Sequence, residues 1–309
     1  MLRTDQNPEI AVVFCADRKV LKGLEVAFVS ALHHLGSEYR LRALLFSLDL
    51  RPEDEAQLRQ RLARVGKPCL FELIDLDLPR LLAGRAVRRF YGGVEPYAKL
   101  LVPDLVQGVR RIIWLDTDVV VCSCLSELYA SDLHGRVVGA VPESTIAWAF
   151  ERDFYRSQGF SDEEHCFNSG VMLIDVERWK ADELTKRALQ VLDAHGPRLN
   201  GDQTVLNMLL RNAFTPLPKR FNQMRYPSSP AVDLERVDGI YHLLCRPKPW
   251  DLLGETVNRN GPLFCKYLDM YSDRRRRSYQ RPSLKALLHS ARLARSYYTA
   301  FAHRRAPGK

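Results

Sequence analysis

The sequence predicts an α/β protein built on a mostly parallel, doubly wound sheet. Short apolar runs that are typical of buried strands occur at residues 10–16, 42–50 and 69–74. Stretches with helical periodicity, residues 21–35 and 52–65, separate these runs. This alternation of strands and helices favours parallel strands joined by crossover helices. With 309 residues, the chain can form one large domain or two smaller ones around a substantial core.

The predicted elements of the first hundred residues follow from local signals. The strand at residues 10–16 closes at Asp17, a good turn residue, before the helical pattern begins. Pro52 stands where the first turn of a helix tolerates proline, so the second helix is expected to begin there. Residues 96–103 are expected to start another helical piece before the next strand.

Residues 111–121, with the sequence RIIWLDTDVVV, form an apolar run that we interpret as a buried strand ending in two acids. In an extended backbone, side chains two residues apart point to the same side, so Asp116 and Asp118 are expected to face one target. Carboxylate oxygens at the carboxyl end of a sheet strand suit a hard divalent cation and, through it, a phosphate. The alternative interpretation is a strand end closed by turn-forming aspartates.

The second half of the chain continues the same pattern. We expect a strand that ends at Glu143, a turn into an apolar strand, an amphipathic helix, a polar turn followed by a short helix, and a compact polar and aromatic loop. These elements correspond to residues 137–142, 167–175, 179–194, 200–207 and 241–250.

Common nucleotide-binding motifs are missing from the sequence. No G-x-G-x-x-G follows the first predicted strand, and no Walker A motif is present. A nucleotide bound by this chain would therefore need another way of holding its phosphates, and metal-bridged carboxylates provide one.

The composition is that of a soluble globular protein, with 46% hydrophobic and 27% charged residues. Residues 1–8 are polar and lack the apolar core of a signal peptide, and the run at 10–16 is far too short to cross a membrane. Seven cysteines at irregular spacing indicate reduced thiols rather than a disulfide framework. We therefore expect a cytoplasmic protein.

The formal net charge of +9 belongs to the C-terminal tail. Residues 274–309 contain eleven Lys or Arg and no Asp or Glu, which leaves the rest of the chain at about −2. Apolar residues recur at helical spacing in this tail, at Leu284, Leu287, Leu288, Ala291, Ala294, Tyr298 and Phe301. We expect a domain at 1–270 and a tail at 271–309 whose basic amphipathic helix binds an anionic membrane surface on its cytoplasmic face. The alternative is a helix docked on the domain. Nucleic acid is not expected, because no other part of the chain resembles a base-contacting module.

Taken in order, four motifs resemble glycosyltransferase family 8, the retaining transferases related to bacterial lipopolysaccharide galactosyltransferases and to glycogenin. They are D-x-D after an apolar strand (Asp116, Asp118), F-N-S-G-V (167–171), a D-Q pair before a helix (Asp202, Gln203), and His242 followed by Lys248-Pro249-Trp250. The resemblance covers roughly residues 9–251. It implies a GT-A-type, Rossmann-like fold.

The resemblance implies a UDP-sugar-dependent hexosyltransferase, with galactose or glucose favoured. The acceptor would be a hydroxyl of a saccharide or glycolipid such as the lipopolysaccharide core or another cell-surface glycan. Asp116, Asp118 and His242 would bind Mn²⁺, or Mg²⁺ in its place, and two carboxylates with one imidazole suit Mn²⁺. The metal would bridge the diphosphate of the donor.

The resemblance also places other residues. Lys248 would contact the diphosphate, Asp17 the uracil or ribose, and Lys99 the region between the phosphate and the donor sugar. Gln203 and Asp202 would act at the reacting sugar, and Glu143 and Asn168 would bind sugar hydroxyls. The sequence departs from the family pattern in lacking an aromatic residue after Asp17, in having Cys245 where relatives carry Gly, and in having Glu143 where Asp is expected.

Two other functions are consistent with parts of the sequence. A haloacid-dehalogenase-type phosphatase also carries D-x-D-x-[TV] after a strand, which Asp116, Asp118 and Val120 match. That motif normally opens its domain, whereas about 115 residues precede it here. A non-catalytic binding protein on the glycosyltransferase fold is the second alternative.

Overall fold

The computed structural model describes residues 7–89, 93–272, 294 and 296–298. It contains a seven-stranded sheet in the order β3-β2-β1-β4-β7-β6-β8 and a three-stranded sheet in the order β5-β10-β9. The strands are β1 (Glu9–Ala16), β2 (Arg40–Ser47), β3 (Cys69–Asp75), β4 (Arg111–Leu115), β5 (Val119–Val121), β6 (Val138–Thr145), β7 (His165–Asp175), β8 (Thr215–Pro216), β9 (Gln223–Arg225) and β10 (Ile240–Leu243).

The larger sheet is mostly parallel, as predicted. β1 pairs in parallel with β2 and β4, β2 with β3, and β6 with β8. β7 is the exception, because it runs antiparallel to both of its neighbours, β4 and β6. This reversal brings the beginning of β7 to the same edge of the sheet as the end of β4.

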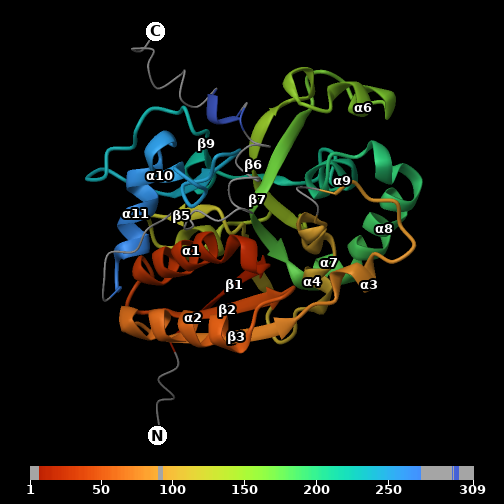
Figure 1. Ribbon diagram of the computed structural model, residues 1–309. Coiled ribbons are helices and arrows are strands. Elements are labelled where there is room, and N and C mark those ends of the chain that lie inside the picture. The colour runs from red at the N-terminus through yellow and green to blue at the C-terminus, as the bar shows by residue number, and fades with distance from the viewer. Residues whose placement is uncertain (1–6, 90–92, 273–293, 295, 299–309) are drawn as a thin grey trace, which may run out of the picture.

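Helices cover both faces of this sheet (Figure 1). α1 and α2 pack on one face with Val12 and Phe14 of β1, whereas Ala11 and Val13 face α7, α8 and α9 on the other. The helices are α1 (Leu21–His33), α2 (Pro52–Val65), α3 (Leu78–Leu81), α4 (Val102–Leu105), α5 (Ser126–Ala130), α6 (Arg152–Ser157), α7 (Val176–Ala181), α8 (Leu184–His195), α9 (Asp202–Leu209), α10 (Gly254–Val257) and α11 (Gly261–Asp269). The 3₁₀ segments include η1 (Arg18–Val20), η2 (Glu95–Leu100), η3 (Ile146–Trp148) and η5 (Lys219–Phe221).

The smaller sheet has a core of its own beside α1. Val120, Tyr241 and Leu243 pack there with Trp250 and with residues of α11. The Trp250 ring lies 5.2 Å from that of Phe264, measured between centroids. This packing holds the segment after β10 against the rest of the molecule.

A buried ion pair joins α1, α2 and the end of α11. Arg61 donates to Glu25 at 2.8 Å, and both side chains are almost fully buried. The same guanidinium donates to the carbonyls of Tyr267, Leu268 and Met270. Arg61 thus satisfies carbonyl groups at the carboxyl end of α11 that the helix itself leaves without partners.

The predicted helix at residues 179–194 is wrong as a single element. The chain forms α7 and α8, separated by Glu183 in a left-handed conformation with φ of 50°. Trp179 and Leu184 are both buried in the same core. Five residues of continuous helix would turn them about 140° apart, so the break allows both to face the sheet.

Two further expectations about the second half need correction. Residues 167–175 are strand throughout, because β7 already begins at His165. The predicted loop at 241–250 begins with a strand, because Ile240–Leu243 pairs with β5 and β9. These partner strands are separated from residues 240–243 in the sequence, so the local polar pattern does not reveal the pairing.

The predicted basic helix of the tail falls, apart from residues 294 and 296–298, outside the described residues. Within the described ranges, no helix combines the length and the apolar character that a membrane span needs. All seven cysteines lie in these ranges, and none forms a disulfide.

Candidate functional site

Asp116 and Asp118 lie in a turn between the two sheets, not in an extended strand as predicted. β4 ends at Leu115 and β5 begins at Val119, so the chain leaves one sheet and enters the other at this point. Asp116 N donates to Gly170 O at 2.8 Å, and Leu243 N donates to Asp118 O at 2.8 Å. The turn is therefore fixed from both sheets.

The structure brings His242 to these two carboxylates. One ligand atom from each of Asp116, Asp118 and His242 lies within 4.8 Å of the others. His242 Nε2 lies 3.1 Å from Asp118 Oδ1 and 3.8 Å from Asp116 Oδ2. The three residues that the sequence nominated as metal ligands thus form one group.

The hydrogen bonds of His242 indicate which ring nitrogen can bind a metal. Its Nδ1 lies 3.1 Å from the side-chain oxygens of both Asn168 and Asn222, which can only accept hydrogen bonds from it. With the proton on Nδ1, Nε2 has a free lone pair directed at the carboxylates. Asp118 Oδ1 is buried and has no hydrogen-bond partner among the described residues. Two electron-rich atoms 3.1 Å apart suit a cation placed between the three side chains.

Gly170 makes this position of the imidazole possible. A Cβ atom there would overlap Cε1 of His242 and would lie 2.5 Å from its Nδ1. The F-N-S-G-V motif therefore needs its glycine for the close approach of a buried side chain rather than for an unusual backbone conformation.

Lys248 reaches the site from the loop after β10. Its Nζ donates to Asp118 Oδ2 at 2.6 Å and to the carbonyl of Leu243. Asp251 fixes this loop by accepting from Lys248 N at 2.7 Å and from Arg246 Nη1 at 2.6 Å. The lysine is thus held in place.

Lys99 connects Asp116 of the turn with Asp202 at the start of α9. It lies in η2, is 6% exposed, and donates to Asp116 Oδ2 at 3.0 Å and to Ser169 Oγ at 3.1 Å. Its ammonium group also lies 3.1 Å from Asp202 Oδ2, which accepts from Ser169 Oγ at 2.8 Å. Lys99 is therefore part of the site and not of a solvated helix face.

Burial and neighbouring charges move the pKa values of the site in opposite directions. Burial raises the pKa of Asp116, although Lys99 opposes this effect. For Asp118 the effect of burial is outweighed above all by the positive charge of Lys248, which holds the pKa of Asp118 well below the usual range. Burial would lower the pKa of Lys99, but Asp116 and Asp202 raise it above the ordinary value. Asp118 and Lys99 are thus held in their charged forms.

Gln203 is held in one orientation beside this group. Its Oε1 accepts from Asn168 Nδ2 at 3.1 Å and from Ser169 N at 3.2 Å. Its Nε2 donates to Glu143 Oε2 at 2.7 Å. The side-chain amide therefore cannot flip without losing these bonds. Gln203, Asn168 and Glu143, which come from three elements, form one hydrogen-bonded set.

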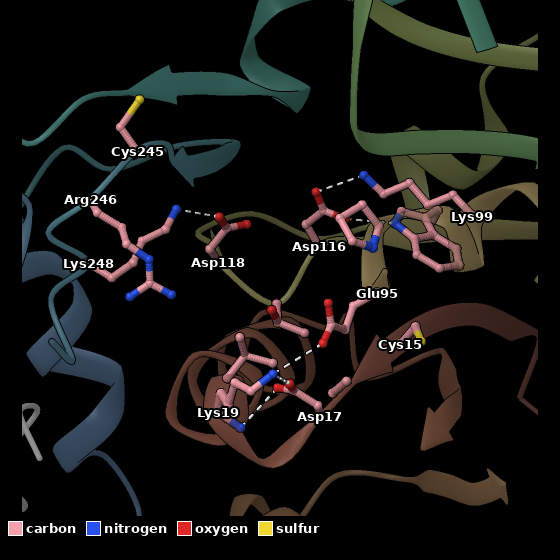
Figure 2. Close-up of a pocket in the computed structure, with 15 residues that line it drawn as sticks. Cys15, Asp17, Lys19, Glu95, Lys99, Asp116, Asp118, Cys245, Arg246 and Lys248 are labelled. Carbon is pink, nitrogen blue, oxygen red and sulfur yellow. Dashed lines mark hydrogen bonds and ion pairs between the residues drawn. The ribbon is translucent and has the colours of Figure 1, made fainter. Parts of the chain in front are cut away.

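A cavity of about 340 Å³ opens at the two aspartates. Figure 2 shows Asp116 and Asp118 in its upper part and Asp17, Lys19 and Glu95 in its lower part. Lys19 Nζ lies 2.9 Å from Asp17 Oδ2 and 3.3 Å from Glu95 Oε1. The cavity therefore has acidic groups at both ends and is lined by cations, namely Lys19, Lys99, Arg246 and Lys248.

Several residues of the site were not identified from the sequence. Ser169 and Gly170 belong to the F-N-S-G-V motif, in which the sequence predicts a binding role for Asn168 alone. Asn222 and Glu95 carry no motif at all. Lys19 lies in the stretch after Asp17 that lacks the expected aromatic residue, and no binding role was predicted for it. Their positions depend on contacts between distant parts of the chain.

Comparison with known proteins identifies relatives over most of the sequence. The model of Glycosyl transferase family 8 matches residues 11–253. General stress protein A of Bacillus subtilis is 24% identical over 257 residues, which are 78% of this chain and 87% of that protein. Glycosyltransferase GlyE of Streptococcus pneumoniae is 25% identical over 263 residues, 80% of this chain but 58% of GlyE.

Solved structures show the same fold. The galactosyltransferase LgtC, solved with donor and acceptor sugar analogues, has a TM-score of 0.69 at 21% identity, covering 84% of this chain and 95% of LgtC. The structure of GlyE has a TM-score of 0.61 at 23% identity, covering 85% of this chain and 62% of that one. The architecture is thus the GT-A-type fold that was expected, and the family match extends over most of the chain. This protein belongs to glycosyl transferase family 8.

Proposed function

We propose that this glycosyltransferase moves a hexose, galactose or glucose, from a UDP-sugar to a hydroxyl of a saccharide acceptor with retention of anomeric configuration. The acceptor would be lipopolysaccharide core or another cell-surface glycan. The observation that carries the proposal is the group of Asp116, Asp118 and His242 at a cavity lined by cations. LgtC, which shares the fold, is a galactosyltransferase that was solved with sugar analogues.

The chemistry of the donor set fits a divalent cation. Two carboxylates and an imidazole with a free Nε2 lone pair leave coordination positions for phosphate oxygens, and Mn²⁺ or Mg²⁺ accepts such a set. Bound there, the ion would offset the negative charge that develops on the leaving diphosphate.

The lysines would bind the donor phosphates. Lys248 Nζ lies 2.6 Å from Asp118 Oδ2, so its positive charge would stand beside diphosphate oxygens bound at that carboxylate. Lys99 is fixed between Asp116 and Asp202, and it would supply a positive charge next to the bond that breaks. Asp17, at the other end of the cavity, would accept a hydrogen bond from the uracil or ribose.

Four residues would bind the transferred sugar. Asp202 lies 3.1 Å from Lys99 and would accept hydrogen bonds from sugar hydroxyls. Gln203, fixed by Asn168 and Glu143, would place a neutral amide dipole beside the anomeric carbon as positive charge develops there. On this proposal the bond between the anomeric carbon and the diphosphate oxygen breaks, the acceptor oxygen bonds to the anomeric carbon from the same side, and the departing diphosphate takes the hydroxyl proton.

The test is a thermal-shift screen with UDP-, GDP- and ADP-sugars, with and without Mn²⁺, followed by assays of sugar transfer and hydrolysis. We expect a UDP-selective shift that requires the metal, because binding to the folded state raises the unfolding temperature. Asp118→Asn should abolish the shift, whereas Asp153→Asn, at an exposed carboxylate of α6, should retain it. Phosphatase activity, or no nucleotide binding by the folded wild type, would overturn the proposal.

We also propose that residues 271–309 attach the domain at 1–270 to the cytoplasmic face of an anionic membrane. The eleven basic residues of the tail and the near-neutral remainder support this division. The full chain should sediment with phosphatidylglycerol vesicles at low salt. Replacing Arg274, Arg275, Arg276 and Arg277 with Gln should weaken this binding, whereas equal binding by wild type and variant would contradict it.

A further inference from the structure

Two aromatic side chains of the segment after β6 project into solvent. Trp148 is 83% exposed and Phe150 is 84% exposed. The other three tryptophans, Trp114, Trp179 and Trp250, are each at most 3% exposed. Exposure of single apolar residues is ordinary, but two nearly bare aromatic rings within three residues form a concentrated apolar surface.

The segment that carries them is held firmly. Ile146 N donates to Glu164 O at 2.8 Å, and Ala149 N donates to Ile146 O at 3.1 Å. Ile146 and Ala149 are buried in a small core. Their burial turns the two aromatic rings outward, so the exposure of Trp148 and Phe150 is a property of an ordered structure.

Both ends of this segment are bonded to the start of α9, beside the candidate sugar site. Glu143 accepts from Gln203 Nε2 at 2.7 Å, and Glu151 accepts from Thr204 Oγ1 at 3.3 Å. Every residue between Glu143 and Glu151 is at most four residues from one of them. Four extended residues span roughly 13 Å, which is therefore the largest backbone distance from the nearer glutamate. Trp148 and Phe150 precede Glu151 by three residues and one residue, so their backbone lies within about 10 Å of a residue that contacts the start of α9.

The charges around the rings favour a sugar over a membrane. Residues 143–157 contain three acids and two arginines, so this segment lacks the basic excess that an anionic lipid surface attracts. Aromatic rings pack against the apolar faces of sugar rings, and nearby carboxylates accept hydrogen bonds from hydroxyl groups. Glu143 and Glu151 at the two ends supply such carboxylates.

We propose that Trp148 and Phe150 form a binding surface for the acceptor, and that this acceptor is a saccharide of at least two sugar rings. One ring would present its hydroxyl near Glu143 and Gln203, and the next would pack on the aromatic side chains. The inference rests on the proposed transferase function and adds to it an acceptor-binding surface and a minimum size of the acceptor.

The first experiment uses Trp148 as its own reporter, because it is the one tryptophan of the four that solvent reaches. Acrylamide quenching of intrinsic fluorescence should therefore come almost entirely from this residue. With UDP and Mn²⁺ present, lactose, maltose or cellobiose should reduce the quenching, and glucose or galactose should reduce it less. The inference would be overturned if none of the disaccharides protected Trp148 from quenching. It would also be overturned if phosphatidylglycerol vesicles protected Trp148 and the disaccharides did not.

The second experiment compares Trp148→Ala and Phe150→Ala with Leu81→Ala, a matched control at a 40% exposed residue of α3. The two aromatic variants should retain the Mn²⁺-dependent thermal shift with UDP. Their KM for the disaccharide acceptor should rise on the order of tenfold, the loss expected for one aromatic contact, and Leu81→Ala should leave transfer unchanged.

The two proposals can fail separately. Wild type that shows no metal-dependent UDP shift would refute the transferase proposal. Wild type that binds UDP and transfers sugar, while both aromatic variants transfer with unchanged KM, would refute only the acceptor surface.

Discussion

Gly170→Ala is the most informative single substitution at this site. The new methyl group would overlap the buried His242 ring, which Asn168 and Asn222 hold from the other side. Overpacking of this kind costs about 1–3 kcal/mol in the free energy of unfolding. Displacing the ring would also lower Mn²⁺ affinity by about 10–100-fold, the usual effect of losing the correct orientation of a metal-ligating histidine. The glycine has an ordinary backbone conformation, so these costs should come from the contact with His242.

Urea unfolding and calorimetric titration with Mn²⁺ would measure the two effects in a double-mutant cycle. In a His242→Ala background the added methyl meets no ring, so Gly170→Ala should then cost less than about 0.5 kcal/mol. Gly139→Ala serves as the matched control, because the three atoms nearest to a Cβ there are leucine methyl groups, the closest at 2.8 Å. It should change stability without changing Mn²⁺ affinity.

Two results would refute this reasoning. One is an equal cost of Gly170→Ala in the wild-type and His242→Ala backgrounds, which would mean that the methyl group clashes with something other than the ring. The other is unchanged Mn²⁺ affinity in Gly170→Ala, which would mean that the imidazole does not bind the ion.

Three further predictions concern stability, pH and the metal. Arg61→Ala removes the buried partner of Glu25 and should lower the free energy of unfolding by about 3–5 kcal/mol in urea titrations; a loss under about 1 kcal/mol would contradict this. The hydrogen bonds from Arg211 lower the pKa of Glu164 to about 2, so the stability they provide is present above its ordinary pKa of 4.5 and is lost as pH falls toward 2. Urea midpoints of Glu164→Gln should therefore fall less steeply than those of wild type between about pH 5 and pH 2, and parallel curves would refute the assignment. Chelation with EDTA should abolish transfer and the UDP-dependent thermal shift, and added Mn²⁺ should restore both; transfer that survives chelation would contradict the metal site.

The sequence predicted those elements whose signals are local. Pro52 marked the start of α2, and the apolar run at 10–16 became β1. The run at 111–121 appeared to be one strand, because nothing in its composition shows that it changes sheets at Asp116. That change depends on the pairing of Val119 with His242, which lies more than a hundred residues away in the chain.

In the candidate site, too, residues with a local motif could be predicted, and residues placed by distant contacts could not. Asp116, Asp118 and His242 were nominated from motifs, and the structure places them together. Asn222, which also contacts His242, could not be found, because a single asparagine without a motif carries no signal. The role of Gly170 could not be predicted either, because only the folded chain shows that the His242 imidazole lies against it.

The small core under Trp148 and Phe150 has a consequence for how the protein can change over time. Its residues Ile146, Ala149, Tyr155, Phe160 and Cys166 form a cluster separate from the cores on the two faces of the large sheet. A substitution in this segment therefore disturbs a minor part of the buried apolar surface. On the proposed role of Trp148 and Phe150, acceptor preference could diverge there with little loss of foldability, while the residues around Asp116 and Asp118 stay constrained by the main cores.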